Sequence, residues 1–231
     1  MQTAAETKER ILDAAERLFA ERGFDGASLR AITGEAAVNL AAVNYHFSSK
    51  EALIRAIMAR RLGALNRRRL ELLDRLEAEA AGGRVPIEDL VRAFAEPVVR
   101  LGGRPGEHAG LRVLLARLYV EPSPAFLGAF ADELGGFVRR FAAAFCRALP
   151  ELPPEVVYWR LTFMVGAVIH SMAAAPLIRL VSGGKCDPAD VEAVVAQLTR
   201  FLSGGFMAES ATVRSAGRRT SRPAGTVRRR K

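Results

Sequence analysis

The first fifty residues contain three helical segments, and their spacing constrains the fold more than any other feature of the chain. Apolar residues form one helical stripe before Gly23: Ile11, Leu12, Ala15, Leu18 and Phe19. Gly23 favours a helix end, and Ser28 is a suitable N-cap for a second helix over residues 29–36. A third helix begins near Leu40. Two short helices joined by a tight turn and packed on a longer helix predict a helix-turn-helix.

Helical patterns also account for the rest of the chain, and no segment shows convincing period-two alternation. Ser48 and Glu51 have the spacing of a capping box, which predicts a long helix that runs to about Glu79. Further helices are expected over 86–101, up to 121, over 124–148 and from 154 to 176. Asp187 is expected to cap a final helix, with Pro188 in its first turn, that ends near 208. The predicted fold class is therefore all-α.

Charge divides the chain into a nearly neutral body and a basic tail. The net charge is +9 at pH 7, and residues 209–231 hold eight basic residues against one acidic residue, which is +7 of that total. Few apolar residues lie among them, so this tail is expected to be disordered. The predicted division is a helix-turn-helix domain over 1–47, a larger helical domain over 48–208 and the tail over 209–231.

The third predicted helix carries side chains suited to DNA contact, because the second helix of the motif enters the major groove. Val43 and Phe47 are expected to face inward, which leaves Asn44, Tyr45 and His46 exposed. Asn can pair bidentately with adenine, while Tyr and His can donate to phosphates. An ordinary three-helix unit without a DNA role is the alternative, but these exposed side chains are hard to explain as packing.

Smaller features point the same way. Ala41 and Ala42 let the backbone approach base edges, and their methyl groups can touch thymine methyls. Lys50 would add a positive charge at a helix N-terminus, which already favours phosphate.

The order of several short runs resembles that of a known family. The runs are 11–15, 18–24, Ser28-Leu29-Arg30, Val43-Asn44-Tyr45-His46-Phe47 and Ser49-Lys50-Glu51-Ala52-Leu53. They closely resemble the N-terminal signature of TetR-family repressors. The resemblance implies a homodimer that binds double-stranded operator DNA. It also implies that residues 48–208 form a ligand-binding and dimerisation domain, with a small-molecule pocket that controls DNA affinity.

The resemblance also assigns DNA contacts to individual positions. Four residues would contact the DNA backbone: Ser28, Tyr45, His46 and Lys50. Four others would lie nearest the bases: Leu40, Ala41, Ala42 and Asn44. The family commonly has Ser or Thr and then Lys at the turn into the recognition helix, where this chain has Asn39 and Leu40. The base preference of better-known members therefore cannot be transferred to it.

Two further segments resemble the PsrA subgroup of this family. They are residues 38–47 and, in the body, Trp159-Arg160 together with the run 163–167. Members of that subgroup are associated with fatty-acid metabolism and with release by long-chain fatty acids or acyl thioesters. The resemblance therefore implies a small apolar effector, such as a long-chain fatty acid or an acyl-CoA.

Apolar residues of the body are candidates for the effector pocket and the dimer interface, with plain core packing as the alternative. The pocket candidates are Phe94, Arg112, Leu115, Leu118, Tyr119, Phe126 and Phe163. Arg112 among them is a cation for an acidic headgroup. The interface candidates are Trp159, Val194, Leu198, Phe201 and Leu202. Two long apolar helices near the end of the chain suit a four-helix dimer seam.

No catalytic residues, cofactor or metal site are predicted. The sequence has no GxSxG, HExxH or paired-carboxylate site, and two cysteines and three histidines leave no room for a zinc cluster. No signal peptide is apparent, and the longest weakly polar stretch, 161–176, is shorter than a bilayer span. A cytoplasmic protein without a membrane partner is therefore expected.

The leading hypothesis is a dimeric, ligand-responsive transcription regulator, most simply a repressor, that binds a partly palindromic operator. One alternative is a helical acyl-thioester-binding protein or enzyme without operator-specific DNA binding, although the sequence offers no nucleophile–base pair for it. Another is an architectural DNA-binding protein driven by the tail. In that case deletion of residues 209–231 would abolish operator selectivity.

Overall fold

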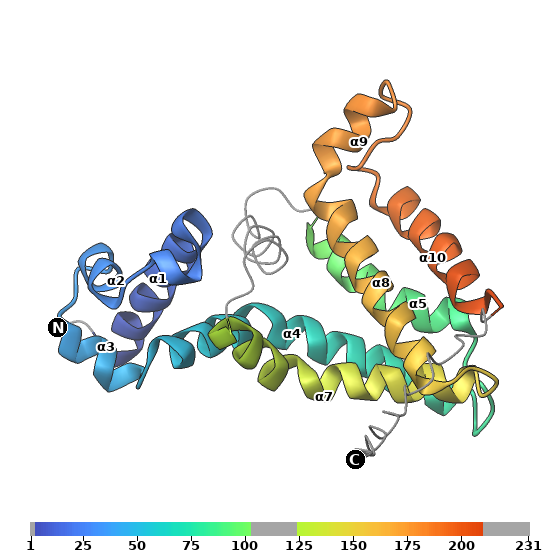
Figure 1. Cartoon of the computed structure of the whole chain (residues 1–231), viewed down its shortest axis with the longest axis horizontal. Helices are drawn as coiled ribbons and strands as arrows, with labels where there is room; N and C mark the ends of the chain where they lie inside the picture. Colours follow the sequence, from blue (N-terminus) through green and yellow to red (C-terminus); the bar gives the residue numbers. More distant parts are fainter. Residues whose placement is uncertain (1–2, 103–123, 210–231) are drawn as a thin grey trace, which may run out of the picture.

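The computed structural model describes residues 3–102 and 124–209, and within these ranges its regular elements are all α-helices (Figure 1). In chain order they are α1 (Ala4–Gly26), α2 (Leu29–Glu35), α3 (Leu40–His46), α4 (Lys50–Glu79), α5 (Ile87–Gly102), α7 (Pro124–Ala148), α8 (Pro154–Ala173), α9 (Ala175–Val181) and α10 (Val191–Met207). The all-α prediction is confirmed. The expected helix that ends at 121 lies outside the described residues, as do residues 210–231 of the basic tail.

Helices α1, α2 and α3 form a small unit around one apolar core. Ile11 and Phe19 of α1, Ile32 of α2 and Val43 of α3 are completely buried, so each helix contributes to the same core. Gly23 interrupts the first helix, as predicted. That residue has a φ of 74°, a left-handed value that glycine adopts without strain, and the helix resumes beyond it as far as Gly26. The predicted helix end is therefore a kink.

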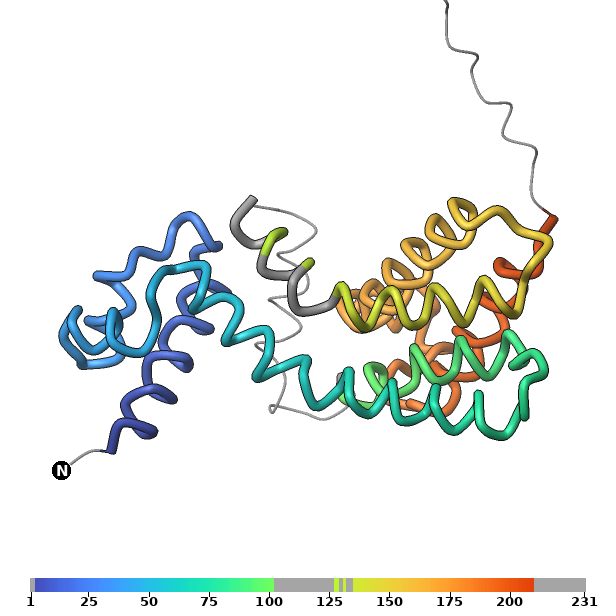
Figure 2. The backbone as a smooth tube through the Cα atoms, turned by 90° about the horizontal axis from the view of Figure 1, so that it is seen from below, coloured from blue at the N-terminus to red at the C-terminus, as the bar shows by residue number. Residues whose placement is uncertain are grey.

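Helix α4 connects this unit to the body and runs without interruption for 30 residues. Figure 2 shows it passing from the first unit into the body. Leu53 and Ile57 near its beginning are buried, and so are Leu62 and Leu73 further along. The helix packs against α1 and also against α5 and α7. One continuous helix thus contributes to the cores of both units.

Two helix caps differ from the prediction. Ser49, and not Ser48, caps α4, and its hydroxyl accepts a hydrogen bond from the amide three residues on at 3.1 Å. Asp190, and not Asp187, caps α10 with the corresponding bond at 3.0 Å. In both cases two nearby residues carry a suitable oxygen, and the path of the backbone into the helix decides which one acts as the cap.

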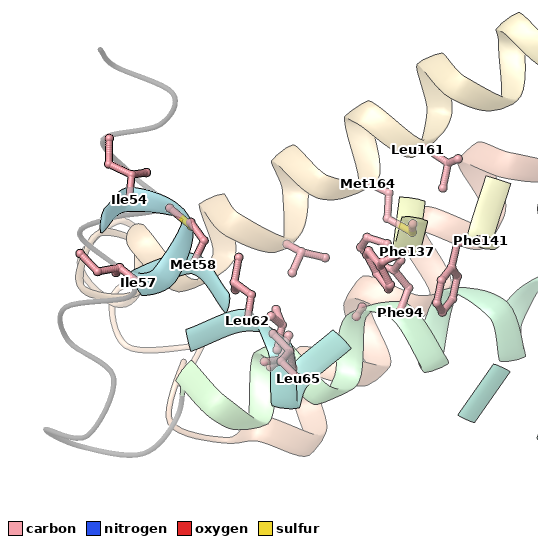
Figure 3. Packing of buried hydrophobic residues seen from close by; sticks show 14 of the residues in the cluster. Ile54, Ile57, Met58, Leu62, Leu65, Phe94, Phe137, Phe141, Leu161 and Met164 are labelled. Carbon is pink, nitrogen blue, oxygen red and sulfur yellow. The ribbon is translucent and has the colours of Figure 1, made fainter. Parts of the chain in front are cut away.

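Aromatic side chains from α5, α7 and α10 fill the core of the body. The rings of Phe94, Phe137 and Phe141 lie 5.0–5.3 Å apart between centroids, and Figure 3 shows these three rings together. Phe145 stacks on Phe206 with centroids 4.3 Å apart. Helix α5 packs along α10, and α4 packs along α7. The body is therefore closed mainly by helices that are distant in sequence.

Helix α8 ends before Pro176, which lies in the first turn of the separate helix α9, so the predicted end near this proline is confirmed. No residue of α9 is buried, and Figure 1 shows this helix extending from the body. At 20 residues, α8 is long and apolar enough to cross a membrane by length and composition, which corrects the expectation that this segment is too short. Helices of soluble proteins pass the same test, and α8 places Val157, Leu161, Met164 and Val168 in the protein core.

Candidate nucleic-acid interface

The exposed face of α3 is set by two buried residues. Val43 is completely buried and Phe47, the residue after the helix, is nearly so, which attaches α3 to the core of the first unit. The opposite side of the helix faces solvent, and Tyr45 is 81% exposed there. Leu40, Ala41 and Asn44 are exposed as well, whereas Ala42 and His46 are half-buried. The residues predicted to lie nearest the bases thus belong to one short helix, and three of those four are open to solvent.

The first turn of α3 explains the unusual Asn39-Leu40 pair. Asn39 is the N-cap, and its side-chain oxygen accepts a hydrogen bond from the Ala42 amide at 2.8 Å. Asn is among the best N-caps, so it replaces the Ser or Thr of other members without loss of the helix start. Leu40 is an exposed large apolar side chain at the very start of the helix. It places an apolar side chain where the pattern that the sequence resembles commonly has Lys.

The predicted backbone contacts flank α3 on neighbouring helices. Ser28 is exposed and caps α2, with its hydroxyl oxygen accepting from the Ala31 amide at 3.1 Å. The hydroxyl hydrogen remains available to donate to a phosphate. Lys50 begins α4, and its Nζ lies 5.9 Å from the centre of the Phe19 ring. The ring of Tyr45 meets that of His46 edge-on with centroids 5.0 Å apart.

Acidic side chains of α1 are neutralised by arginines of α4. Arg60 donates to Glu9 at 3.0 Å, to Asp13 at 2.8 Å and to Glu16 at 2.6 Å. Arg61 donates to Glu16 as well, at 2.9 Å. Three carboxylates of α1 are therefore paired with arginines within the protein.

The structure describes only part of the predicted effector pocket. Arg112, Leu115, Leu118 and Tyr119 lie outside the described residues, and of Phe126 only the backbone in α7 is described. Phe94 is buried against Phe137 and Phe141 in the core of the body. Phe163 does not share this core. It is 63% exposed on α8 and stacks on Trp159 with centroids 5.9 Å apart, so in the single chain it lies on the surface and not beside Phe94.

One buried cation of the body was missed by the sequence interpretation. Arg69 lies among several arginines of α4, yet it is one of the few buried charged residues in the part of the chain that the structure describes. The spacing of Leu62, Leu65, Arg69 and Leu73 holds the signal, because these residues share one face of a helix. The position of Arg69 in that stripe, rather than its charge, is the sequence signal of its burial.

The predicted interface residues divide into two groups. Trp159 and Phe201 are strongly exposed, the latter at 74%, and Val194 and Leu198 are half-buried. Leu202 is buried in the core of its own chain, so it is not free to contact a partner. This corrects its assignment. Tyr158, which was not predicted, adds a further exposed aromatic ring to α8.

The described residues contain no group of three or more His, Cys, Asp or Glu side chains that could hold a metal ion. An open apolar hollow of about 780 Å³ lies beside α9 and is lined by Ala175, Pro176, Arg179, Leu180, Gly183, Gly184 and Pro188. None of the predicted pocket residues lines it.

Comparison with known families decides the relationship of the chain. Residues 11–57 match the model described as bacterial regulatory proteins, tetR family, and residues 92–205 match the model described as tetracyclin repressor-like, C-terminal domain. The chain belongs to the TetR family. This family consists of transcription regulators rather than enzymes, as the sequence analysis predicted.

Known TetR-family members resemble the chain over different parts. The regulator UidR of Escherichia coli K12 is 49% identical over 59 residues, which cover 25% of this chain and 30% of UidR. The structure of FadR from Bacillus subtilis in complex with stearoyl-CoA superposes with a TM-score of 0.54 at 16% identity, covering 85% of this chain and 98% of FadR. NalD of Pseudomonas aeruginosa, the secondary repressor of a multidrug efflux pump, superposes with a TM-score of 0.58 at 20% identity, covering 86% and 97%.

These relationships carry different kinds of information. The sequence relationship to UidR covers only part of each protein, because the matched residues span 25% of this chain and 30% of UidR. The structural likenesses extend over the body but are low in identity, so they show the shared fold alone. The PsrA subgroup stays a prediction.

Proposed function

We propose that this protein is a dimeric, ligand-responsive transcription regulator that binds a palindromic operator and is released by a small apolar effector. One observation carries the proposal: α3 is anchored through Val43 and presents Leu40, Ala41, Asn44 and the 81% exposed Tyr45 to solvent. A large aromatic ring left in water has no role in the core of the unit, whereas it suits contact with a partner.

The proposed division of labour follows the geometry of α3. Its first turn, with Leu40, Ala41 and Ala42, and then Asn44, would face the base edges in the major groove. Tyr45, His46, Ser28 and Lys50 would hold the phosphates on either side. A dimer doubles these contacts and places two copies of α3 about one turn of DNA apart, which requires a partly palindromic operator.

The proposed dimer forms through α8 and α10. Trp159, Phe163 and Phe201 are exposed aromatic residues on these two helices. Aromatic residues are enriched in the buried centre of protein interfaces, so their exposure on one chain favours a second copy as the partner. A dimer interface of this kind would cover the apolar face of α8, so this face needs no contact with a membrane. This is in keeping with a cytoplasmic location.

The proposed effector is a small apolar molecule, with a long-chain fatty acid or an acyl-CoA as the first candidates. The interior of the body around Phe94 is apolar and aromatic, and the FadR that shares this fold was solved with stearoyl-CoA. Such a ligand would act by binding one arrangement of the body more tightly than another. Because α4 belongs to both units, that arrangement would set the spacing of the two copies of α3.

The DNA-binding part is tested with Tyr45→Ala. Wild-type protein is first used to select binding sites from a random double-stranded library, and the selected sites should be palindromic. In a gel-shift titration at fixed salt, Tyr45→Ala should bind such a site at least about tenfold more weakly, while sedimentation shows an intact dimer. Leu127→Ala, which truncates an exposed apolar side chain of the body, is the matched control. Equal affinity of wild type and Tyr45→Ala would refute the assignment of α3.

The effector part is tested separately by thermal-shift measurements with free fatty acids and acyl thioesters of graded chain length. Stabilisation that grows with chain length is expected, because each added methylene buries more apolar surface. If no member of either series stabilises the protein, the fatty-acid effector is wrong and the DNA-binding proposal still stands.

A further inference from the structure

Arg69 is a buried cation without a carboxylate partner among the described residues. The residue is 6% exposed and lies in α4 where this helix meets α5 and α7. Its Nε donates to the Phe94 carbonyl oxygen at 2.7 Å, and its Nη1 donates to the Asn66 side-chain oxygen at 3.4 Å. The guanidinium carbon lies 4.4 Å from the centre of the Phe94 ring and 5.0 Å from that of Phe137.

Neighbouring arginines show how unusual this arrangement is. Arg60 and Arg61, on the same helix, both pair with Glu16, and Arg140 of α7 pairs with Glu77. These partners compensate for partial burial of the charge. Arg69 is more deeply buried than all three, and its hydrogen-bond and ring contacts with the described residues are to two neutral oxygens and two aromatic rings.

This environment disfavours the cation and favours an incoming anion. Burial lowers the pKa of Arg69 to about 9, so the side chain still carries its charge at neutral pH. A buried charge without a counter-ion is costly, because neutral oxygens replace its hydration only in part. Two hydrogen bonds also leave further N–H groups of the guanidinium able to donate. A carboxylate would bind here in a medium of low dielectric, where a charge-assisted hydrogen bond is strong.

We propose that Arg69 receives the carboxylate of an amphipathic acid whose apolar chain lies among the helices of the body. The inference rests on the proposed function, in which the body binds an apolar effector, and it specifies the chemistry of that effector. The carboxylate end would be buried at Arg69. A free fatty acid has this group at the end of its chain, whereas an acyl-CoA has an uncharged thioester there and carries its phosphates on a bulky nucleotide.

The position of Arg69 also links such a ligand to the DNA-binding unit. The same helix packs Leu53 and Ile57 into the core near its beginning and carries Arg69 further along. The oxygen and rings that hold the guanidinium belong to α5 and α7. A carboxylate that draws the guanidinium away from them would change how α4 packs on both helices.

The experiment measures binding of palmitate, methyl palmitate and palmitoyl-CoA to the full-length protein by isothermal titration calorimetry. Wild type should bind palmitate about 10- to 100-fold more tightly than its methyl ester, the usual value of a charge-assisted hydrogen bond. Arg69→Met removes the guanidinium and leaves an unbranched apolar side chain. This variant should bind palmitate and methyl palmitate with the affinity that the wild-type protein has for the ester. Arg92→Met, which removes a half-exposed arginine of α5, should keep the preference.

Other results would overturn the inference. A preference for palmitate that survives in Arg69→Met would assign the carboxylate to another group. The carboxylate site would also be refuted if the wild-type protein binds palmitate and its methyl ester equally, binds neither of them, or prefers palmitoyl-CoA. The operator-binding test with Tyr45→Ala does not depend on any of these results. If Arg69→Met does not fold, Arg69→Lys can be used instead. It keeps the positive charge but loses the planar guanidinium with its paired N–H donors, so it should retain only part of the preference for palmitate over methyl palmitate.

Discussion

Arg60 of α4 donates from Nη2 to Oε2 of Glu16 on α1 over 2.6 Å, and the Glu16 side chain is only 6% exposed. Burial by itself lowers the pKa of Arg60, but its hydrogen bonds to Glu9, Glu16 and Asp13 outweigh that effect and raise the pKa. Arg61 pairs with Glu16 as well, so five charged groups join α1 to α4. These groups form a joint between α4 and α1, the helix on which α2 and α3 pack.

Removing the charge of Glu16 should therefore weaken this joint. Glu16→Gln is expected to lower the free energy of unfolding by about 1–3 kcal/mol, because a nearly buried carboxylate accepts from two arginines. Urea unfolding measures the change. Glu9→Gln is the control, since its mostly exposed carboxylate should contribute less than about 1 kcal/mol. Equal losses in the two variants would contradict the importance of the buried pair.

The cap of α4 makes a second prediction. Ser49→Ala should destabilise the protein by about 1 kcal/mol, because it removes the oxygen that accepts from the Ala52 amide. The exposed neighbour Ser48 makes no cap bond, so Ser48→Ala should change the free energy of unfolding by only a few tenths of a kcal/mol. Thermal unfolding of both variants checks this. The reverse order would show that Ser48 is the cap in solution.

The proposed dimer seam makes a third prediction. Phe201→Asp places a charge where a large aromatic ring is 74% exposed on one chain, and it should weaken the dimer by about 2 kcal/mol or more. Sedimentation at several protein concentrations measures the shift toward monomer. Leu127→Asp makes the same kind of change on α7 and should leave the dimer intact. A dimer unaffected by Phe201→Asp would place the interface elsewhere.

Stability should depend on pH through Glu77, which joins α4 to α7. Arg140 donates to its carboxylate at 2.8 and 2.6 Å, and Arg147 also pairs with it. The hydrogen bonds from Arg140 are the main cause that holds the pKa of Glu77 below 4.5. A lowered pKa in the folded state adds stability above the unfolded value, and this stability is lost as the pH falls through the folded value.

Glu77→Gln should accordingly lower the free energy of unfolding at neutral pH by less than about 1 kcal/mol, because these ion pairs are partly exposed to water. The difference from wild type should disappear in strongly acidic solution, where Glu77 itself is protonated. Urea unfolding at both pH values provides the comparison. Glu71→Gln, which removes a longer pair with Arg68 within α4, should show little effect at either pH. A difference that persists in acid would exclude the carboxylate charge as its cause.

The features that the sequence predicts correctly are those that depend on short-range interactions along the chain. Ser28 caps α2 as predicted, and Val43 and Phe47 turn inward as predicted, because these features depend on neighbours within one or two helical turns. Where two equivalent candidates lay close together the prediction failed, as with Asp187 and Asp190. The hydrogen bond of a cap is local, but the chain path that selects between two residues is set by the packing of the helix.

The sequence alone predicted the helix-turn-helix, most of the described helices and the exposure of Asn44 and Tyr45, since helical periodicity and capping depend on nearby residues, whereas His46 is half-buried and not exposed as predicted. Three other properties required the arrangement of helices in space. Leu202 turns into its own core, Phe163 joins Trp159 on the surface, and Arg69 is enclosed by residues of α5 and α7. Burial is a property of what covers a side chain, and the covering helices here come from distant parts of the chain.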